Sequence, residues 1–216
     1  MIGLLTPMAN PTVERELRRL LPDDVDYVVG RLTSDEADST KRLRAYAEHL
    51  DCAVRQFGGM PLSALAFACT ASSYLVGREG EDRIAARLRQ PVLWAAATVR
   101  DALGRARVRR IAVISPYPAA IHAAGLAYWQ ACGFALVFDR RIEIGSEDTR
   151  AIYALGQDAA QAAIDEARQV APDAILLSGT GMATLSLVES NAEPRVLSSN
   201  HCLAAAMIAQ ANGASA

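Results

Sequence analysis

The stretch ALAFACTASS, residues 64–73, decides the fold of this chain. It begins as a run of apolar residues and ends abruptly in hydroxyl side chains, with Cys69 at the change. A short apolar run of this kind is typical of a strand buried in a parallel sheet. Ligands of open α/β sheets bind beyond the carboxyl ends of the strands. We therefore predict an α/β fold with Cys69 at its functional edge, although a free cysteine is also often a buried packing residue.

The rest of the chain alternates strand and helix patterns. We expect strands at 2–5, 25–32, 65–69, 91–94, 110–115, 134–138, 174–178 and 195–198. We expect helices at 11–21, 39–57, 79–89, 96–103, 121–132, 150–170 and 202–211, with a polar loop at 142–149 and a short helical turn at 185–189.

This series occurs twice along the chain. IGLLTP at residue 2 corresponds to IAVISP at residue 111, and ALAFACT at residue 64 corresponds to AILLSGT at residue 174. A repeat of this length predicts two pseudo-symmetric lobes, each with a four-stranded parallel sheet flanked by helices, and an active site between the lobes. We place the N-terminal lobe at 1–96 and the C-terminal lobe at 97–216, with the last helix able to pack back on the first lobe.

Composition excludes several classes of partner. The chain of 216 residues is 51% apolar and has a net charge of −2 without a basic run, so we expect no nucleic-acid partner. No apolar stretch approaches the roughly 18 residues that span a bilayer, and the start MIGLLTP does not resemble a signal peptide. Four widely spaced cysteines without a CxxC motif predict neither a disulfide framework nor a zinc site, and so a cytoplasmic protein. The SGTG loop is too short for a nucleotide motif, so we expect no cofactor.

Several polar groups fall at the ends of the predicted strands. Asn10, Thr70 and Tyr117, together with backbone N–H groups after Cys69 and Gly179, offer hydrogen-bond donors to an anion. Each has a structural alternative, since an asparagine before a helix is a common cap and a tyrosine between two prolines is a common turn residue.

The last strand leads into a second group of candidates. Asn200 could line the cleft or cap the last helix, and Cys202 is the rival reactive thiol because a helix N-terminus lowers the pKa of cysteine. His201 beside it does not make a metal site without further ligands. Cys52 and Cys132 lie within predicted helices and are expected to be structural.

The strand-end Cys69, the PMAN turn, the SPY turn and the LSGTG loop together resemble the aspartate/glutamate racemase superfamily. The resemblance is greatest to the branch of maleate cis–trans isomerase and arylmalonate decarboxylase. It implies that Cys69 is the nucleophilic cysteine and that Asn10 and Tyr117 bind a substrate carboxylate. It also places Asp148 near the position of another substrate-binding asparagine. The second cysteine of the family should fall within residues 178–180, where this chain has Ser-Gly-Thr.

The missing thiol disfavours a two-base racemase, because the alcohol of Thr180 can donate a hydrogen bond but cannot replace a thiol as acid or base. Two reactions remain open for Cys69. It could add to an alkene, allow rotation and be eliminated, or it could protonate the product of a malonate decarboxylation. In the decarboxylases the resemblance puts the cysteine where this chain has Gly179, so here the proton would arrive from the opposite face.

We therefore predict a cofactor-independent, maleate-isomerase-like enzyme that acts on a small mono- or dicarboxylate through Cys69, with an arylmalonate-type decarboxylase as the alternative. A non-catalytic small-molecule binding protein is a third possibility, because fold does not fix function. The resemblance leaves a homo-oligomer open. The residues do not identify the substrate or what replaces the second cysteine.

Overall fold

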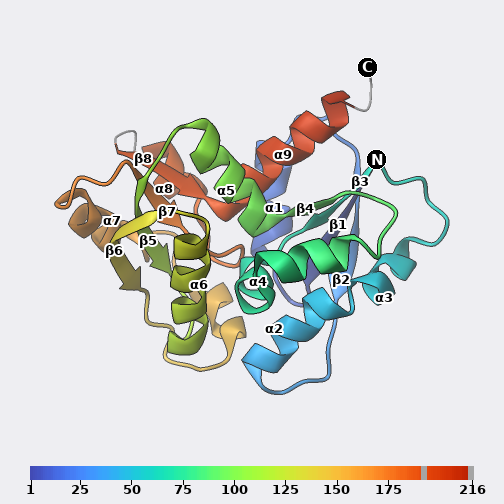
Figure 1. The fold of residues 1–216 in the computed structure, drawn as a ribbon, viewed down its shortest axis with the longest axis horizontal. Helices are drawn as coiled ribbons and strands as arrows, with labels where there is room; N and C mark the ends of the chain where they lie inside the picture. Colours follow the sequence, from blue (N-terminus) through green and yellow to red (C-terminus); the bar gives the residue numbers. More distant parts are fainter. Residues whose placement is uncertain (191–193, 214–216) are drawn as a thin grey trace.

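The computed structural model describes residues 1–190 and 194–213. Within these residues the strands form two four-stranded parallel sheets that lie beside each other (Figure 1). The first sheet has the order β2-β1-β3-β4, with β1 (Ile2–Pro7), β2 (Tyr27–Leu32), β3 (Ala64–Phe67) and β4 (Val92–Trp94). The second has the order β6-β5-β7-β8, with β5 (Arg110–Ser115), β6 (Ala135–Arg141), β7 (Ala174–Leu177) and β8 (Arg195–Ser198).

Helices cover both sheets. They are α1 (Thr12–Leu20), α2 (Ser39–Glu48), α3 (Leu50–Val54), α4 (Thr70–Ala85), α5 (Ala95–Arg105), α6 (Ala119–Ala131), α7 (Gln161–Arg168), α8 (Leu185–Ser190) and α9 (Ser199–Gly213). Two 3₁₀ turns, η1 (Arg55–Phe57) and η2 (Thr149–Ala154), complete the described elements.

The register of the central strands reproduces the sequence repeat. Ile2 of β1 is paired with Ala64 of β3, and the repeated residue Ile111 of β5 is paired with Ala174 of β7. All four residues of β3 and of β7 are buried, as expected for strands covered on both faces. The ends of β3 and β7 are therefore equivalent positions, which makes Gly179 the pseudo-symmetric counterpart of Cys69.

The last helix crosses from the second sheet to the first (Figure 1). Leu203, Ala204 and Met207 of α9 belong to the same buried cluster as Ile2 and Leu4 of β1. The boundary between the lobes near residue 96 stays a prediction, and the predicted second lobe includes residues 191–193 and 214–216, which lie outside the described part.

Three predicted helices differ in the structure. The helix expected at 79–89 begins at Thr70, directly after Cys69, and bends at Gly77, whose φ is 69°. The helix expected at 39–57 is interrupted at His49 and continues as α3 and η1. The long helix expected at 150–170 is wrong, because residues 149–154 form η2 and α7 begins only at Gln161. Its alanine-rich composition favours helix, but the segment between η2 and α7 contains Gly156, a poor helix former.

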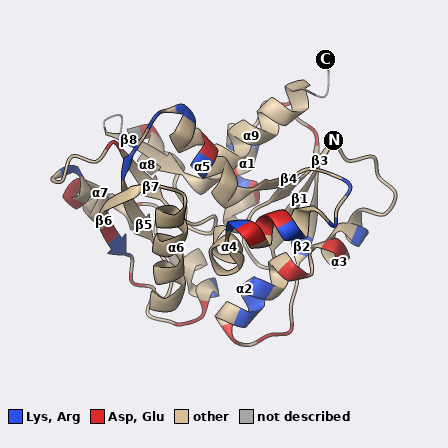
Figure 2. Cartoon of the chain, in the orientation of Figure 1, with Lys and Arg blue, Asp and Glu red and all other residues tan. Residues whose placement is uncertain are grey.

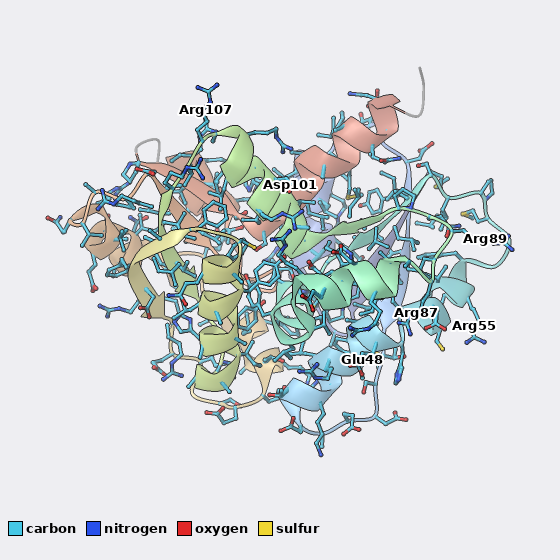
Figure 3. The ribbon with its side chains drawn as sticks, in the orientation of Figure 1. Glu48, Arg55, Arg87, Arg89, Asp101 and Arg107 are labelled. Carbon is cyan, nitrogen blue, oxygen red and sulfur yellow. The ribbon has the colours of Figure 1, made fainter. Side chains whose placement is uncertain are left out.

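Charged side chains lie mainly on the helices and connections at the outside of the molecule. In the view of Figure 2, basic and acidic stretches alternate along the outer helices, whereas α6 carries neither sign. The guanidinium of Arg87, labelled in Figure 3, donates to the carbonyl of Glu48 at 2.8 Å and so ties the segment after α4 to α2. Among the described helices, none is long and apolar enough to cross a membrane.

Candidate active site between the lobes

A small cavity lies beyond the carboxyl ends of the central strands, and both lobes contribute to it. The first lobe supplies the β1–α1 turn, one face of α2, and Cys69. The second lobe supplies Tyr117, η2 and the loop after β7. The cavity measures about 30 Å³, room for only one or two water molecules. A ligand of several atoms therefore requires the lining side chains to move outward.

Cys69 occupies the N-cap position of α4 with extended backbone (φ −147°, ψ 100°), because β3 ends just before it and the helix begins just after. Its side chain is 3% exposed, and its sulfur accepts a hydrogen bond from the Ser72 hydroxyl at 3.1 Å. Burial raises the pKa of the thiol, whereas hydrogen bonds from the Ser72 side chain and from the backbone N–H groups of Ser72 and Ala71 act to lower it. Burial dominates, so at neutral pH the resting group is a thiol with donors ready to stabilise its thiolate.

Tyr117 faces the same cavity from the second lobe. Its hydroxyl lies 2.8 Å from the hydroxyl of Thr70, a fully buried residue at the start of α4 that sits behind the cavity wall. Burial raises the pKa of Tyr117 well above its usual value, and a charge on Cys69 would raise it further. The phenol is therefore neutral, and it is close enough to Cys69 for a charge on the sulfur to raise its pKa. Its hydrogen bond with Thr70 joins the two lobes.

The loop after β7 presents two residues to the first lobe. Gly179 has a φ of +136°, and a Cβ built on it would lie 3.3 Å from Cδ of Pro116 and 3.4 Å from the Tyr117 hydroxyl. Its N–H donates to the Ser199 hydroxyl at 3.1 Å, so that this group is not free for an anion. Thr180 lines the cavity, but its hydroxyl donates to the Ala68 carbonyl at 2.9 Å. The loop is thus fixed against the end of β3.

Asn10 combines the two roles that its sequence position suggests. Its Oδ1 accepts the N–H groups of Thr12 at 2.9 Å and Val13 at 3.4 Å, as a helix cap does. The residue is 3% exposed and lines the cavity, and no hydrogen bond within the described residues engages its amide nitrogen. The cap therefore leaves a donor for a ligand.

Asp148 lies outside the wall of this cavity, next to two arginines that are part of the wall. It accepts Nη2 of Arg42 at 2.8 Å and binds the guanidinium of Arg150 with both carboxylate oxygens. The hydrogen bonds from Arg150, with a smaller contribution from the charge of Arg42, lower the pKa of Asp148 to about 2. Two guanidinium groups against one carboxylate leave this side of the cavity with one net positive charge.

The two arginines were missed by the sequence reasoning, as were Tyr46 and Tyr153, whose rings also line the cavity. Arg42 could have been found, because it precedes Tyr46 by four residues and therefore shares the buried face of α2. Arg150 and Tyr153 carry no such signal, since they lie in the stretch whose helical prediction is wrong.

Asn200 is completely buried behind the cavity wall. Its Nδ2 donates to Glu16 at 2.7 Å and to the Thr180 carbonyl at 3.2 Å, so it supports the loop instead of lining the cavity. Burial raises the pKa of Cys202 to about 12, and this thiol is not on the cavity wall. Among the described residues, no group of three His, Cys, Asp or Glu side chains is arranged to hold a metal ion.

Solved structures with the same fold include enzymes of two kinds. The maleate isomerase Iso from Pseudomonas putida S16 is 19% identical, with a TM-score of 0.85 over 98% of this chain and 92% of that chain. A maleate cis–trans isomerase mutant from Nocardia farcinica with a covalently bound succinylcysteine intermediate is 21% identical, with a TM-score of 0.83 over 98% and 92%. Arylmalonate decarboxylase is 20% identical, with a TM-score of 0.75 over 98% and 92%. At these identities the likeness concerns the fold, and it confirms the predicted pair of α/β lobes.

No curated protein matches the sequence. The family model described as arylmalonate decarboxylase matches residues 2–214, nearly the whole chain. This match confirms the predicted superfamily branch and, with the shared fold, fits the expectation of an enzyme related to both the isomerases and the decarboxylases. The chain belongs to the arylmalonate decarboxylase family.

Proposed function

We propose that this protein is a cofactor-independent isomerase that interconverts the cis and trans forms of a small unsaturated dicarboxylate through Cys69. The observation that carries the proposal is the pairing in one cavity of a single thiol with two guanidinium groups, those of Arg42 and Arg150. The thiol supplies a nucleophile, and the net positive charge supplies a reason for the substrate to be an anion.

The reaction follows from that pairing. Cys69 loses its proton to solvent, and the thiolate adds to one alkene carbon, so that an S–C bond forms and the π electrons move to the neighbouring carbon and its carboxylate. The bond between the two carbons is then single and can rotate. Reversal of the addition expels the thiolate and restores the double bond in the other configuration.

The cavity also limits the substrate class. Its outer wall combines Arg42, only 5% exposed, with Arg150 and the phenol of Tyr46. Charged and polar groups at this place favour a second carboxylate over an aryl group, because an apolar ring would desolvate them without compensation. Asn10 offers its amide nitrogen to the other carboxylate. A four-carbon diacid such as maleate has the required groups.

Decarboxylation is the second candidate, and one specific observation favours it. Burial raises the pKa of Cys69, so the thiol is protonated at neutral pH, as a proton donor must be. In that reaction a disubstituted malonate would lose carbon dioxide, and the thiol would protonate the resulting enediolate. The two candidates share Cys69 but differ in product.

The test is a product assay on the purified protein with maleate and with phenylmalonate, followed by proton NMR and by carbon dioxide release. We expect fumarate from maleate and no carbon dioxide. Cys69→Ala should abolish turnover, whereas Cys202→Ala, which removes a buried thiol away from the cavity, should retain it. Carbon dioxide without fumarate would replace the proposal by the decarboxylase. Binding of maleate without any product would show a binding protein. A cytoplasmic location is part of the proposal, because the nucleophile must stay reduced.

A further inference from the structure

Addition of Cys69 to an alkene leaves an electron pair that Cys69 itself cannot protonate. The electron pair displaced from the double bond resides on the neighbouring carbon and its carboxylate, and a proton donor there would stabilise it as a C–H bond. The sulfur is by then bonded to the substrate. A second acid on the cavity wall is therefore needed if the adduct is to be protonated.

The second lobe offers few acids for this step. Asp148 is ionised, paired with two arginines and off the wall, and Thr180 is an alcohol whose hydrogen bond goes to Ala68. The remaining second-lobe candidates on the wall are the phenols of Tyr117 and Tyr153. Phenols are far stronger acids than alcohols, so the choice within the second lobe, which faces Cys69, lies between these two.

The pseudo-symmetry of the fold distinguishes the two phenols. Gly179 is the counterpart of Cys69, at the end of β7 where Cys69 is at the end of β3. A side chain at 179 would begin 3.4 Å from the Tyr117 hydroxyl. By symmetry, a side chain at position 179 would face Cys69 from the second lobe, but the chain has only a glycine there. The ionisable oxygen of Tyr117 lies beside this position.

The hydrogen bond between Thr70 and Tyr117, in which either hydroxyl can donate, is compatible with this role. When the Thr70 hydroxyl donates to the Tyr117 oxygen across 2.8 Å, the phenol proton is left for the cavity, and the same bond stabilises the phenolate after the proton has gone. At neutral pH the Tyr117 phenol is protonated, because burial raises its pKa. The phenolate, once formed, is correspondingly a strong base.

We propose that Tyr117 is the second catalytic residue, the acid that protonates the carbon next to the one attacked by Cys69 and the base that later removes a proton from that carbon. The proposal rests on the proposed isomerase function. In the forward step the S–C bond and a C–H bond form while the O–H bond of Tyr117 breaks. In the return step the phenolate takes a proton, the double bond forms and the C–S bond breaks.

This sequence has a stereochemical consequence. The sulfur and the phenolate keep their positions, so removal of the same hydrogen that was added only regenerates the original isomer. Rotation brings the other hydrogen of that carbon to the phenolate, and its removal gives the opposite isomer. Each isomerisation therefore exchanges one carbon-bound hydrogen of the substrate for the hydrogen that Tyr117 supplied, which came from water.

The experiment is turnover of maleate in D₂O, with the deuterium content of the fumarate read by NMR and mass spectrometry. We expect close to one deuterium per fumarate molecule for the wild-type protein. Tyr117→Phe should lower kcat by about 10²- to 10⁴-fold, the usual contribution of a general acid or base. Any residual fumarate made by this variant should contain no deuterium. Tyr153→Phe, which removes a phenol from the same cavity, should leave the deuterium content per fumarate unchanged.

The outcomes separate this inference from the proposed function. Fumarate formed by the wild-type protein without deuterium, or labelled fumarate from Tyr117→Phe, would overturn the role of Tyr117 while leaving the isomerase intact. Absence of maleate turnover in the wild-type protein would overturn the isomerase itself. Binding of succinate to Tyr117→Phe, measured by calorimetry, shows that the variant is folded, and a Kd that changes far less than kcat is the expected result.

Discussion

Replacement of Glu16 by alanine tests how the two lobes hold the site together. Glu16 lies on α1 of the first lobe and is 2% exposed. It accepts the N–H groups of Thr184 at 2.5 Å and Leu185 at 3.1 Å and the side-chain amide of Asn200 at 2.7 Å. Asn200 in turn donates to the carbonyl of Thr180 on the cavity wall. One buried carboxylate therefore fixes the second-lobe loop.

The magnitude follows from these three donors and from a fourth, the Thr184 hydroxyl, which donates to Glu16 at 3.1 Å. A hydrogen bond to a charged acceptor is worth about 1.5–3 kcal/mol, and breaking a buried charged interaction on one side costs about 3–5 kcal/mol in total, since water partly replaces the carboxylate. We expect Glu16→Ala to lower the free energy of unfolding by about 4 kcal/mol. For a chain of this length that corresponds to a fall in Tm of about 8–16 °C.

The assay is urea unfolding followed by circular dichroism, with Glu14→Ala as the matched control. Glu14 is on the same helix, but its ion pair with Arg31 joins side chains that are 32% and 41% exposed. Such a pair contributes about 0–1 kcal/mol. A loss below about 1 kcal/mol for Glu16→Ala, or equal losses for the two variants, would refute the reasoning that the buried carboxylate anchors the loop.

Three further predictions test single features. The rate of Cys69 alkylation by iodoacetamide should rise with pH, with a midpoint above the ordinary thiol pKa of about 8.5, because burial raises the pKa of this thiol. A midpoint below that value would contradict the burial argument. Asp148→Asn should tighten succinate binding at pH 7 by about fivefold, because a partly buried ion-pair partner worth about 1 kcal/mol no longer offsets Arg42 and Arg150. Since Arg150 lowers the pKa of Asp148 to about 2, the wild-type carboxylate loses its charge only near that pH. Calorimetry that shows weaker binding would refute the charge argument. Gly179→Ala should lower the free energy of unfolding by about 1–3 kcal/mol, because φ is +136° at this position. Gly104→Ala, inside α5 with open space around it, should instead raise the free energy of unfolding by up to about 1 kcal/mol. Similar changes in Tm for both variants would contradict the positive φ assigned to Gly179.

The fold was predictable because its signals are local and repeated. Short apolar runs such as residues 64–69 are typical of strands in a sheet covered on both faces, and the matching runs at residues 2 and 111 predict the same arrangement in both lobes. The failures are also local in origin. At 150–170 alanine-rich composition favoured one long helix, but tertiary packing of η2 over the cavity and the break around Gly156 override that weak preference. The start of α4 at Thr70 was not predicted, because serine and threonine support both turns and helix starts.

The site was predictable only in part. Cys69, Asn10, Tyr117 and Thr180 come to one cavity because each follows a central strand, and the ends of parallel strands share an edge. Thr70, Gly179 and Asn200 lie behind the wall, where hydrogen bonds to Tyr117, Ser199 and Glu16 engage them. Asp148 lies off the wall and pairs with Arg42 and Arg150. No local pattern predicts such pairings, because the partners lie up to 184 residues apart.

By itself the sequence determined the two α/β lobes and the strand-end edge at which Cys69 lies, since hydrophobic periodicity and strand ends are properties of short segments. Only the tertiary structure decided the charge of the cavity and which side chain lies beside Gly179, the counterpart of Cys69. Arg42 and Arg150 meet around Asp148, and the Tyr117 hydroxyl lies beside Gly179, through contacts between elements far apart in the chain. The physical reason is that electrostatic and hydrogen-bond interactions depend on distances of a few ångströms in space, which the order of residues along the chain does not encode locally.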